Sequence, residues 1–467
     1  MFSISAPAED WTRFRGPNGS GVSQDKGFPT EFSKAKNLLW RTPVRAGKSS
    51  PVLTSQYIFL TGCEKDKLFT QCFHRDTGKL IWERPEVRTR KEVGNLLNHP
   101  AAITPVTDGE NVYSLFKDFG LISYSADGKL RWKVPLGPFL NIAGMSASPI
   151  LAGDSVIVLA DQIHSSYIAA FDRRNGETRW KTPRAEAESW TTPLLYDSPC
   201  SNALILTAAG GQFGAYRSSD GIRAFTQLGL SQAMVASPVL SGNIIYAFGY
   251  GLGQETTFAG YLAHLDKNHD GQLTPDEYLN GPDDPDHLTA GILSVIASTG
   301  NGDGIVTREK FDAVRAQLAG PSRLLAVGLD CKTGRETIAR PHELWHYDKS
   351  FDGVIPSPLI YDGVVYLIKN GGVLTALDAS TGTVLKTGRV SGALGEYSAS
   401  PVAADGKVFL ASEEGKVAVL RAGRDWDVLA VNDLSEGTFA SPALSQGRIY
   451  LRTDDALYCF GFGHSSP

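Results

Sequence analysis

The stretch Ala147-Ser-Pro149-Ile150 is one of eight copies of a short phrase that consists of a small residue, a proline and an aliphatic residue. The eight prolines are Pro51, Pro105, Pro149, Pro193, Pro238, Pro358, Pro401 and Pro442. Their spacings are 54, 44, 44, 45, 120, 43 and 41 residues, so all but one lie between 41 and 54. Self-similarity at a nearly fixed period of this length is typical of repeat architectures.

Each repeat predicts four short β-strands. The phrase opens the first strand, a second apolar stretch follows, as in 57–61 or 364–368, and a third ends in a tight turn such as Asp76-Thr-Gly78. Glycine supplies the positive φ that such a turn requires. In three repeats the fourth strand carries a tryptophan four residues after the turn glycine, namely Trp82, Trp132 and Trp180. Four strands per repeat are typical of one blade of a β-propeller.

The two ends of the chain predict how the ring of blades closes. The eighth repeat, 441–462, has only three strands. Near the N-terminus, 37–43 contains Trp40-Arg-Thr-Pro43, which matches the Trp-x-x-Pro phrase that begins at Trp82 and Trp132. A strand from the N-terminus would cover a sheet edge that is otherwise exposed. The sequence therefore predicts an all-β fold, an eight-bladed β-propeller closed by the N-terminal strand.

The spacing of 120 residues indicates an insertion in the fifth blade. Strand-like segments at 243–250 and 323–329 flank it, so it lies between the second and third strands of that blade. We divide the chain into an N-terminal extension (1–36), the first part of the propeller (37–251), an insert (252–321) and the rest of blade 5 with blades 6–8 (322–467). Loops at this place share a face with the blade-to-blade connections, so we expect the insert to overhang one mouth of the central channel.

Residues 266–277 of the insert match the twelve-residue calcium loop of an EF-hand at each informative position. Side-chain oxygens stand at positions 1, 3, 5 and 9, a glycine makes the sharp turn at position 6, a main-chain carbonyl serves position 7, and a bidentate carboxylate stands at position 12. The predicted calcium ligands are Asp266, Asn268, Asp270, Gln272, Thr274 and Glu277. An acidic surface turn is the alternative. The insert is therefore predicted to be a small α-helical EF-hand pair.

A second loop, 299–310, follows 33 residues later. It keeps a glycine at position 6 and an apolar residue at position 8, where Val306 would pair with Leu273 of the first loop. It departs at position 1, which is Thr299, and at position 12, where Lys310 places an ammonium instead of a carboxylate. We expect a structural partner with little or no calcium affinity, unless Glu309 shifts into the site. With one complete loop, calcium is expected to order the insert rather than to act as a signal.

Composition and charge exclude several classes of protein. The chain has 45 Lys plus Arg and 50 Asp plus Glu, a net charge of -5, so it lacks the basic footprint of a dedicated nucleic-acid binder. No run approaches the roughly 18 apolar residues of a membrane span. The five cysteines form no Cys-x-x-Cys pair, which argues against zinc and redox motifs. Ser5-Ala-Pro-Ala8 fits the cleavage box of an export signal, and an ordinary terminus is the alternative.

The phrase Asp172-Arg-Arg-Asn-Gly-Glu-Thr-Arg-Trp180 resembles the tryptophan-docking motif of the pyrroloquinoline-quinone (PQQ)-like propellers. The opening from Trp11 to Gly21 is similar to the start of exported bacterial members. The resemblance implies eight blades, each clamped to its neighbour by a tryptophan, although blade 6 has Lys386 at that position. The family includes quinoprotein alcohol and sugar dehydrogenases and a non-enzymatic scaffold of outer-membrane protein assembly. Its alcohol dehydrogenases place a vicinal disulfide beside PQQ, and this chain has no Cys-Cys pair, so matched residues do not support that cofactor.

The loops on one face of such a propeller are expected to gather charged and aromatic side chains at the mouth of the central channel. Blade-to-blade connections would contribute Lys48, His99, Glu188, Trp190, Asp348, Asp352 and Glu396, and loops between second and third strands would contribute Lys65, Lys117, Asp161, His164, Lys369, Glu413 and Asp454. Such groups suffice for acid–base chemistry or sugar binding. The catalytic candidates are Asp161, His164, His99, Trp190, Asp352 and Lys369. Asp161 and His164 come first because they share one loop, and a solvated loop residue is the alternative for each.

These observations favour a bacterial calcium-binding propeller, periplasmic or secreted, that acts as a binding or scaffold module for a protein or carbohydrate ligand. The alternative is an enzyme at the channel mouth, either a quinoprotein-type dehydrogenase or a carbohydrate-active enzyme. We expect no nucleic-acid partner and no transmembrane segment.

Overall fold

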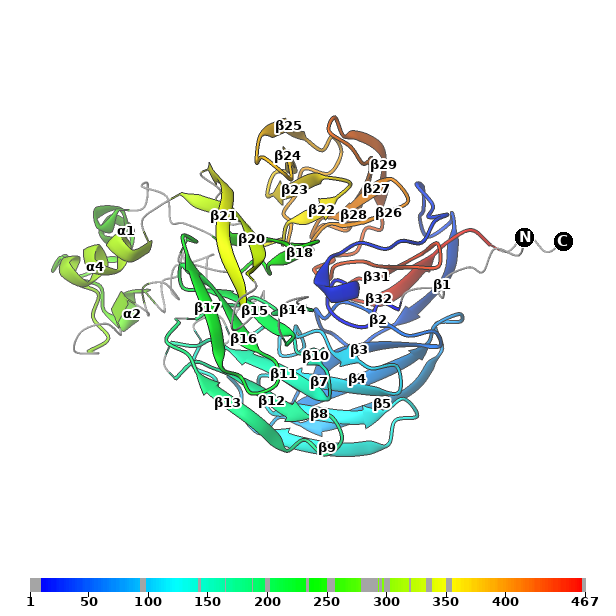
Figure 1. Ribbon diagram of the computed structural model, residues 1–467, viewed down its shortest axis with the longest axis horizontal. Helices are drawn as coiled ribbons and strands as arrows, with labels where there is room; N and C mark the ends of the chain where they lie inside the picture. The colour runs from blue at the N-terminus through cyan, green and yellow to red at the C-terminus, as the bar shows by residue number, and fades with distance from the viewer. Residues whose placement is uncertain are drawn as a thin grey trace.

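The computed structural model describes residues 10–92, 98–141, 144–163, 165–186, 188–197, 202–231, 235–249, 257–278, 293, 296–297, 303–318, 321–332, 338–349 and 355–463. Its strands form eight four-stranded antiparallel sheets that follow one another around a ring (Figure 1). Each sheet is one blade, and its shortest strand is the innermost one. The predicted all-β, eight-bladed propeller is confirmed.

The blades follow the repeats of the sequence. Blade 1 contains β2 (Val52–Leu53), β3 (Tyr57–Glu64), β4 (Lys67–His74) and β5 (Leu80–Val87); blade 2 β6 (Val106–Thr107), β7 (Asn111–Phe116), β8 (Gly120–Ser125) and β9 (Leu130–Pro135); blade 3 β10 (Ile150–Ala152), β11 (Ser155–Ala160), β12 (Tyr167–Asp172) and β13 (Thr178–Pro183); blade 4 β14 (Leu194–Tyr196), β15 (Leu204–Ala209), β16 (Gln212–Arg217) and β17 (Arg223–Leu228). Blade 5 contains β18 (Val239–Ser241), β19 (Ile244–Gly249), β20 (Ser322–Lys332) and β21 (Ile338–Lys349); blade 6 β22 (Leu359–Tyr361), β23 (Val364–Lys369), β24 (Val373–Asp378) and β25 (Val384–Arg389); blade 7 β26 (Val402–Ala404), β27 (Lys407–Ala411), β28 (Lys416–Arg421) and β29 (Asp427–Asp433); blade 8 β30 (Ala443–Ser445), β31 (Arg448–Arg452), β32 (Ala456–Phe460) and β1 (Leu38–Pro43).

The N-terminal strand closes the ring. β1 pairs antiparallel with β32, with Trp40 opposite Cys459 and Thr42 opposite Leu457. The first and last strands of the propeller thus share blade 8, and β1 covers the edge that β32 would otherwise expose. The closure that the Trp-x-x-Pro phrase predicted is confirmed.

The recurring phrase forms a closed belt of hydrogen bonds around the channel. In every blade the residue before the proline donates its backbone N–H to the hydroxyl of the corresponding residue in the next blade, at 2.9–3.1 Å. The eight residues, in order, are Ser50, Thr104, Ser148, Thr192, Ser237, Ser357, Ser400 and Ser441, and Ser441 bonds back to Ser50. All eight are buried. Because a buried N–H requires an acceptor, a small hydroxyl residue is needed before each proline.

Tryptophans dock each of several blades onto the next. Trp132 donates its Nε1–H to the Arg173 carbonyl at 3.0 Å, and its ring lies over Gly176, where an added Cβ would meet the ring at 2.8 Å. Gly176 also has a φ of 78°, so the turn and the indole both require glycine. The same pairing of indole and glycine occurs for Trp40 with Gly78, Trp82 with Gly128, Trp180 with Gly221 and Trp345 with Gly382.

Blade 6 has Lys386 at the position where these five blades have tryptophan. The Lys386 Nζ donates to the Trp426 carbonyl of blade 7 at 2.7 Å and pairs with Asp425 at the same distance. It also lies 4.7 Å from the centroid of the Trp426 ring. The ammonium therefore supplies the interblade hydrogen bond, and the indole comes from the next blade instead.

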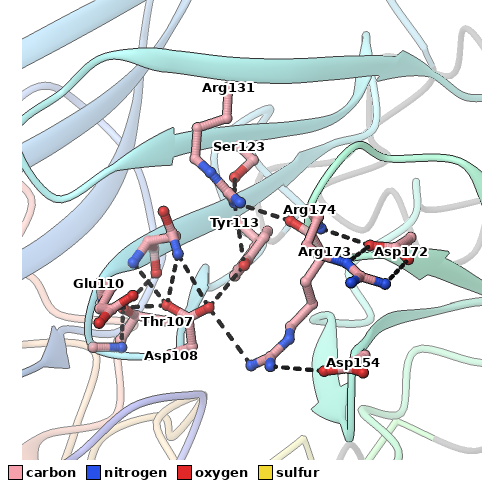
Figure 2. Close-up of polar contacts among 12 residues, drawn as sticks. Thr107, Asp108, Glu110, Tyr113, Ser123, Arg131, Asp154, Asp172, Arg173 and Arg174 are labelled. Atoms are coloured by element: carbon pink, nitrogen blue, oxygen red, sulfur yellow. Dashed lines mark hydrogen bonds and ion pairs between the residues drawn. The ribbon is translucent and has the colours of Figure 1, made fainter.

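Polar side chains add a second link between blades 2 and 3 (Figure 2). Arg173 lies between Asp108 of one blade and Asp154 of the other, with nitrogen–oxygen distances of 3.6 Å and 3.3 Å. Arg131 donates to the Arg173 carbonyl at 2.9 Å and to the Ser123 hydroxyl at 3.0 Å. Partly exposed ion pairs of this kind add little stability each, so the network fixes the relative position of the blades more than it stabilises the fold.

The N-terminal segment 10–24 covers one end of the central channel. Its two arginines, Arg13 and Arg15, are buried, and burial lowers the pKa of each guanidinium to about 9. Both donate to backbone carbonyls of distant blades rather than to carboxylates. The segment makes hydrogen bonds with the first-strand regions of five blades, at Leu53, Thr107, Pro193, Pro358 and Ala403. The chain therefore closes this end of the channel with its own N-terminal segment.

The insert carries the helices α1 (Phe258–Leu265), α2 (Pro275–Tyr278) and α4 (Arg308–Leu318) between β19 and β20. It has a small core of its own, in which the rings of Phe258 and Phe311 lie 5.3 Å apart. Leu273 and Val306 exchange two backbone hydrogen bonds of 2.9 and 3.0 Å, as the loop alignment predicted. The expected overhang of the channel mouth is wrong, because the helices lie beside blade 5, outside the ring (Figure 1).

Among the described residues, no helix combines the length and the apolar character that a bilayer span requires.

Candidate functional site

The loops between second and third strands meet the blade-to-blade connections on one face of the ring. Lys48 N donates to Ala101 O at 2.9 Å and so joins two blade-to-blade connections, and Glu413 N donates to Glu396 O at 2.8 Å and so joins the loop between β27 and β28 to a third connection. This face lies at the end of the channel opposite the one that residues 10–24 cover. The mouth that the sequence predicted is therefore formed, and its residues are the candidate site.

One side of the mouth is cationic and surrounds His99. Burial, and then the positive charges of Arg452, Lys48 and Lys117, lower the pKa of His99 to about 4. Its Nδ1 accepts a hydrogen bond of 3.1 Å from the Ala101 amide, which requires a lone pair on that nitrogen. His99 is therefore a neutral imidazole at neutral pH. Lys117 is buried, and its Nζ donates to the Asn98 carbonyl at 2.9 Å.

The other side of the mouth is acidic. Burial raises the pKa of Glu413 and of Asp454, and the charge of Lys48 works against that rise in both. Burial also lowers the pKa of Lys48, whose Nζ lies 3.3 Å from the centroid of the Phe439 ring. The Ser398 hydroxyl donates to the Glu413 carboxylate. Burial thus moves the pKa of Lys48 and of both carboxylates towards neutrality, whereas it moves the pKa of His99 away from neutrality.

The chemistry open to this arrangement is proton transfer or recognition of a polar ligand. A carboxyl with a raised pKa and an amine with a lowered pKa are the groups used for general acid–base work. The same groups hydrogen-bond sugar hydroxyls or peptide amides. The sequence named Lys48, His99, Lys117, Glu413 and Asp454 for the mouth, and His99 was the one catalytic candidate among these five.

Asp161, the first catalytic candidate, is engaged in a buried ion pair. Arg184 holds both of its oxygens, Nε to Oδ1 at 2.6 Å and Nη2 to Oδ2 at 3.1 Å, and the Ser189 hydroxyl donates to Oδ2 at 2.7 Å. Both charged side chains are 0% exposed. Arg184 also donates to the Tyr216 hydroxyl at 2.7 Å. Through Arg184 the loop of β11 and β12 is joined to the next blade, and both oxygens of Asp161 are buried and engaged.

Of the four remaining catalytic candidates, two lie among the described residues. Trp190 is partly buried and donates its Nε1–H to the Gly144 carbonyl at 3.0 Å, beside Asn98, which donates to the same oxygen at 3.1 Å. Lys369 ends β23 at the mouth face. His164 and Asp352 lie outside the described residues.

Asp348 differs from its expected place in a blade-to-blade connection. It belongs to β21, where it pairs with Arg323 of the neighbouring strand through two contacts of 2.6 Å. The long hairpin of β20 and β21 extends past the usual strand ends and takes up this residue.

Sequence reasoning missed Arg452, one of the cations around His99. It is fully buried at the end of β31 and donates to the Ser49 hydroxyl at 2.7 Å and to the Thr61 carbonyl at 2.9 Å. The repeats gave only a weak signal. The second strands of four other blades end in Phe116, Ala160, Ala209 and Ala411, but those of blades 1 and 6 end in Glu64 and Lys369, so a charged residue at this place is not exceptional.

The loop 266–277 of the insert has a defined backbone geometry. Gly271 N donates to Asp266 Oδ2 at 3.0 Å, Asp270 N donates to Asn268 Oδ1 at 2.9 Å, and Gln272 N donates to Asp270 Oδ1 at 2.8 Å. These bonds curl the loop around the first, third and fifth side chains. Glu277 is buried and receives backbone bonds of 3.0 Å from Lys267 and 2.8 Å from Thr274. Within the described part of the chain, no three His, Cys, Asp or Glu side chains gather into a metal-binding group.

Comparison with known structures shows the fold. BamB from Moraxella catarrhalis is 14% identical, with 91% of this chain and 100% of that chain covered at a TM-score of 0.56. The computationally designed Ika8 protein is 12% identical, with the same coverage and a TM-score of 0.53. A quinohemoprotein alcohol dehydrogenase from Pseudomonas putida is 9% identical, covers 98% of this chain and 81% of its own, and has a TM-score of 0.43, too low to carry an argument. None of the curated proteins matches the chain.

The family comparison covers the propeller on both sides of the insert. Residues 69–252 and 312–461 match the family described as outer membrane protein assembly factor BamB. The matched parts exceed half of the chain and leave out most of the insert. This chain therefore belongs to the PQQ-like propeller family described as outer membrane protein assembly factor BamB.

Proposed function

We propose that this chain is an exported, calcium-binding propeller that acts as a binding or scaffold module for a protein or carbohydrate ligand, in the periplasm or outside the cell. The family description, an assembly factor, supports a protein partner. The mouth, with cationic and acidic sides joined at Lys48, supports a polar ligand. The calcium site rests on the loop of the insert.

The observation that carries the calcium site is the unpartnered Oδ1 of Asp266. This oxygen is shielded from solvent and has no hydrogen-bond partner among the described residues, whereas Oδ2 accepts from Gly271. A buried carboxylate oxygen without a partner is destabilising. A calcium ion would supply the missing partner if it were bound by this oxygen and by Asn268, Asp270, the Gln272 carbonyl and Glu277.

Glu277 is prepared for the same role. Burial alone would raise its pKa, but hydrogen bonds from Thr274 and Lys267 outweigh burial and hold the pKa below its ordinary value. The carboxylate therefore stays ionised, and each oxygen keeps a lone pair for a cation. Among the described residues no three such side chains gather, so Asp266, Asp270 and Glu277 would have to draw together around the calcium ion as it binds.

Calcium in this loop would order the insert. The exiting helix α2 has only four residues, and the core of the insert is small. A sensor needs a large apolar groove that opens on binding. Binding energy in so small a unit acts mainly as folding energy.

The calcium site is tested with Glu277→Gln and a matched control. Glu277→Gln removes the bidentate carboxylate and should weaken calcium binding, measured by isothermal titration, by about a hundredfold or more. Asp276→Asn makes the same change of charge at an exposed neighbour and should bind calcium like the parent chain. Equal binding by Glu277→Gln and Asp276→Asn would show that the ion does not bind in this loop.

An enzyme at the mouth is the second candidate, and the perturbed pKa values of Lys48, Glu413 and Asp454 favour it. The residues do not fit the PQQ site that the resemblance implies. That site has a disulfide between adjacent cysteines, and among the described residues Cys63, Cys72 and Cys459 are buried and free, with no two of them adjacent in the sequence. The proposal therefore derives no reaction through PQQ.

A further inference from the structure

The second loop of the insert contains an ammonium group among its oxygens. The Nζ of Lys310, from the first turn of α4, lies 2.6 Å from Asp303 Oδ1, 3.0 Å from the Ile305 carbonyl and 3.4 Å from the Ala297 carbonyl. The Lys310 side chain is 13% exposed. Its three donors therefore meet three oxygens inside the insert rather than water.

These oxygens correspond to ligand positions of the first loop. Asp303 stands at position 5 and Ile305 at position 7, where the first loop has Asp270 and Gln272. Lys310 itself stands at position 12, the place of Glu277. The lysine at position 12 thus takes the place of the carboxylate that a calcium ion needs, and it brings a positive charge to the oxygens that remain.

The described part of the second loop, 303–310, keeps backbone features of the first loop. Gly304 and Gly271 have the same φ of 78°. Ile305 N donates to Asp303 Oδ1 at 2.8 Å, as Gln272 N donates to Asp270 Oδ1 at 2.8 Å. Positions 5 to 7 therefore turn as in a cation-binding loop, although position 12 has no carboxylate. Glu309 is exposed, and among the described residues no contact joins its carboxylate to these oxygens.

We propose that the Lys310 ammonium is a tethered substitute for a calcium ion in the second loop, which orders this half of the insert without metal. Through the two hydrogen bonds between Val306 and Leu273, the ordered half then holds the first loop in its binding form. This second step rests on the proposed calcium site in 266–277. Preorganisation of this kind raises the affinity of the first loop without adding a ligand.

The first test measures the ammonium alone, in protein freed of calcium with a chelator. Lys310→Met keeps the aliphatic stem and removes the charge, and the amides of Val306 and Leu273 should then exchange with solvent at least about tenfold faster. Arg308→Met removes a positive charge from the same turn, at a side chain that is 72% exposed, and should leave this exchange unchanged. Unchanged exchange in Lys310→Met would overturn the proposal, whether or not the chain binds calcium.

A double-mutant cycle separates the contact from general destabilisation. Asp303→Asn should also speed exchange at Val306, and the double variant Asp303→Asn, Lys310→Met should exchange little faster than either single variant, because both remove one interaction. Additive effects would show that Lys310 and Asp303 act independently and would contradict the substitute role.

The second test asks whether Lys310→Met strengthens or weakens calcium binding to the first loop. Removal of a nearby positive charge should by itself strengthen calcium binding, as Arg308→Met should show. Loss of the tethered ion should instead weaken binding to the first loop by about tenfold in Lys310→Met, since the loop must then be ordered at the expense of binding energy. Tighter binding by Lys310→Met would overturn the coupling between the loops. An absence of calcium binding in the parent chain would instead reject the proposed calcium site and leave the exchange result standing.

Discussion

Gly176 combines two requirements that the sequence alone expresses only as a turn. Its φ of 78° is unfavourable for residues with a Cβ, and the ring of Trp132 occupies the space that a Cβ would take. Gly153, in the same blade, has a φ of 53° but no atom within 4 Å of its Cβ position. The two glycines therefore separate the conformational requirement from the packing requirement.

Substitution of these glycines should show that difference. Gly153→Ala should lower the free energy of unfolding by about 1 kcal/mol, the penalty of a left-handed residue with a Cβ. Gly176→Ala should lower it by about 2–4 kcal/mol, because the indole must also move. Urea unfolding of both variants measures the two losses. Equal losses would mean that Trp132 does not dock on Gly176 as described.

His99 makes a prediction about pH. Its pKa is about 4 in the folded chain, against an ordinary value near 6.5, so between these values the unfolded chain binds a proton that the folded chain does not. The contribution of neutral His99 to stability is therefore complete above about pH 6.5 and is lost as the pH falls towards 4. His99→Gln can still accept from the Ala101 amide but does not titrate.

The free energy of unfolding of His99→Gln should thus fall less steeply than that of the parent chain between about pH 6.5 and 4. Urea unfolding at several pH values in this window compares the two, and carboxylates that titrate there cancel in the difference. Parallel pH profiles would show that His99 is protonated as easily in the folded chain as in the unfolded one.

At the scale of elements, the strands and their order were predictable because their signals are local and repeated eight times. Each proline phrase, turn glycine and docking tryptophan marks one place in a blade, and Trp40-Arg-Thr-Pro43 marked the closing strand. The partners of the mouth residues were not predictable, since they come from different blades. Nothing in the loop of Asp161 indicates that Arg184, 23 residues later, turns back to bind it.

Strand β25 shows how one blade departs from the repeat and still docks. Lys386→Met should remove the hydrogen bond to the Trp426 carbonyl and lower the free energy of unfolding by about 1 kcal/mol. Lys129→Met, which breaks an ion pair at a lysine side chain that is 83% exposed, should leave it unchanged within the error of the measurement. Thermal or urea unfolding compares the two, and an equal effect would mean that Lys386 is a surface residue without a docking role.

At the scale of the whole molecule, the closed belt from Ser50 to Ser441 and the shared blade 8 make the propeller a rigid frame. The N-terminal segment covers one end of the channel, and the charged mouth lies at the other end. Within this frame Asp161 and Trp190 have their polar atoms engaged by the protein itself. What the mouth presents to a ligand is the group of Lys48, His99, Glu413 and Asp454, which suits recognition of a polar partner.

The most direct test of the binding-module proposal is a titration of the purified chain with PQQ in the presence of calcium, followed by absorbance, with a dye-reduction assay on alcohols and sugars. The proposal predicts no saturable PQQ binding and no dye reduction above that of the chain without PQQ. Saturable binding with substrate-dependent dye reduction would contradict it and make this chain a quinoprotein-type dehydrogenase.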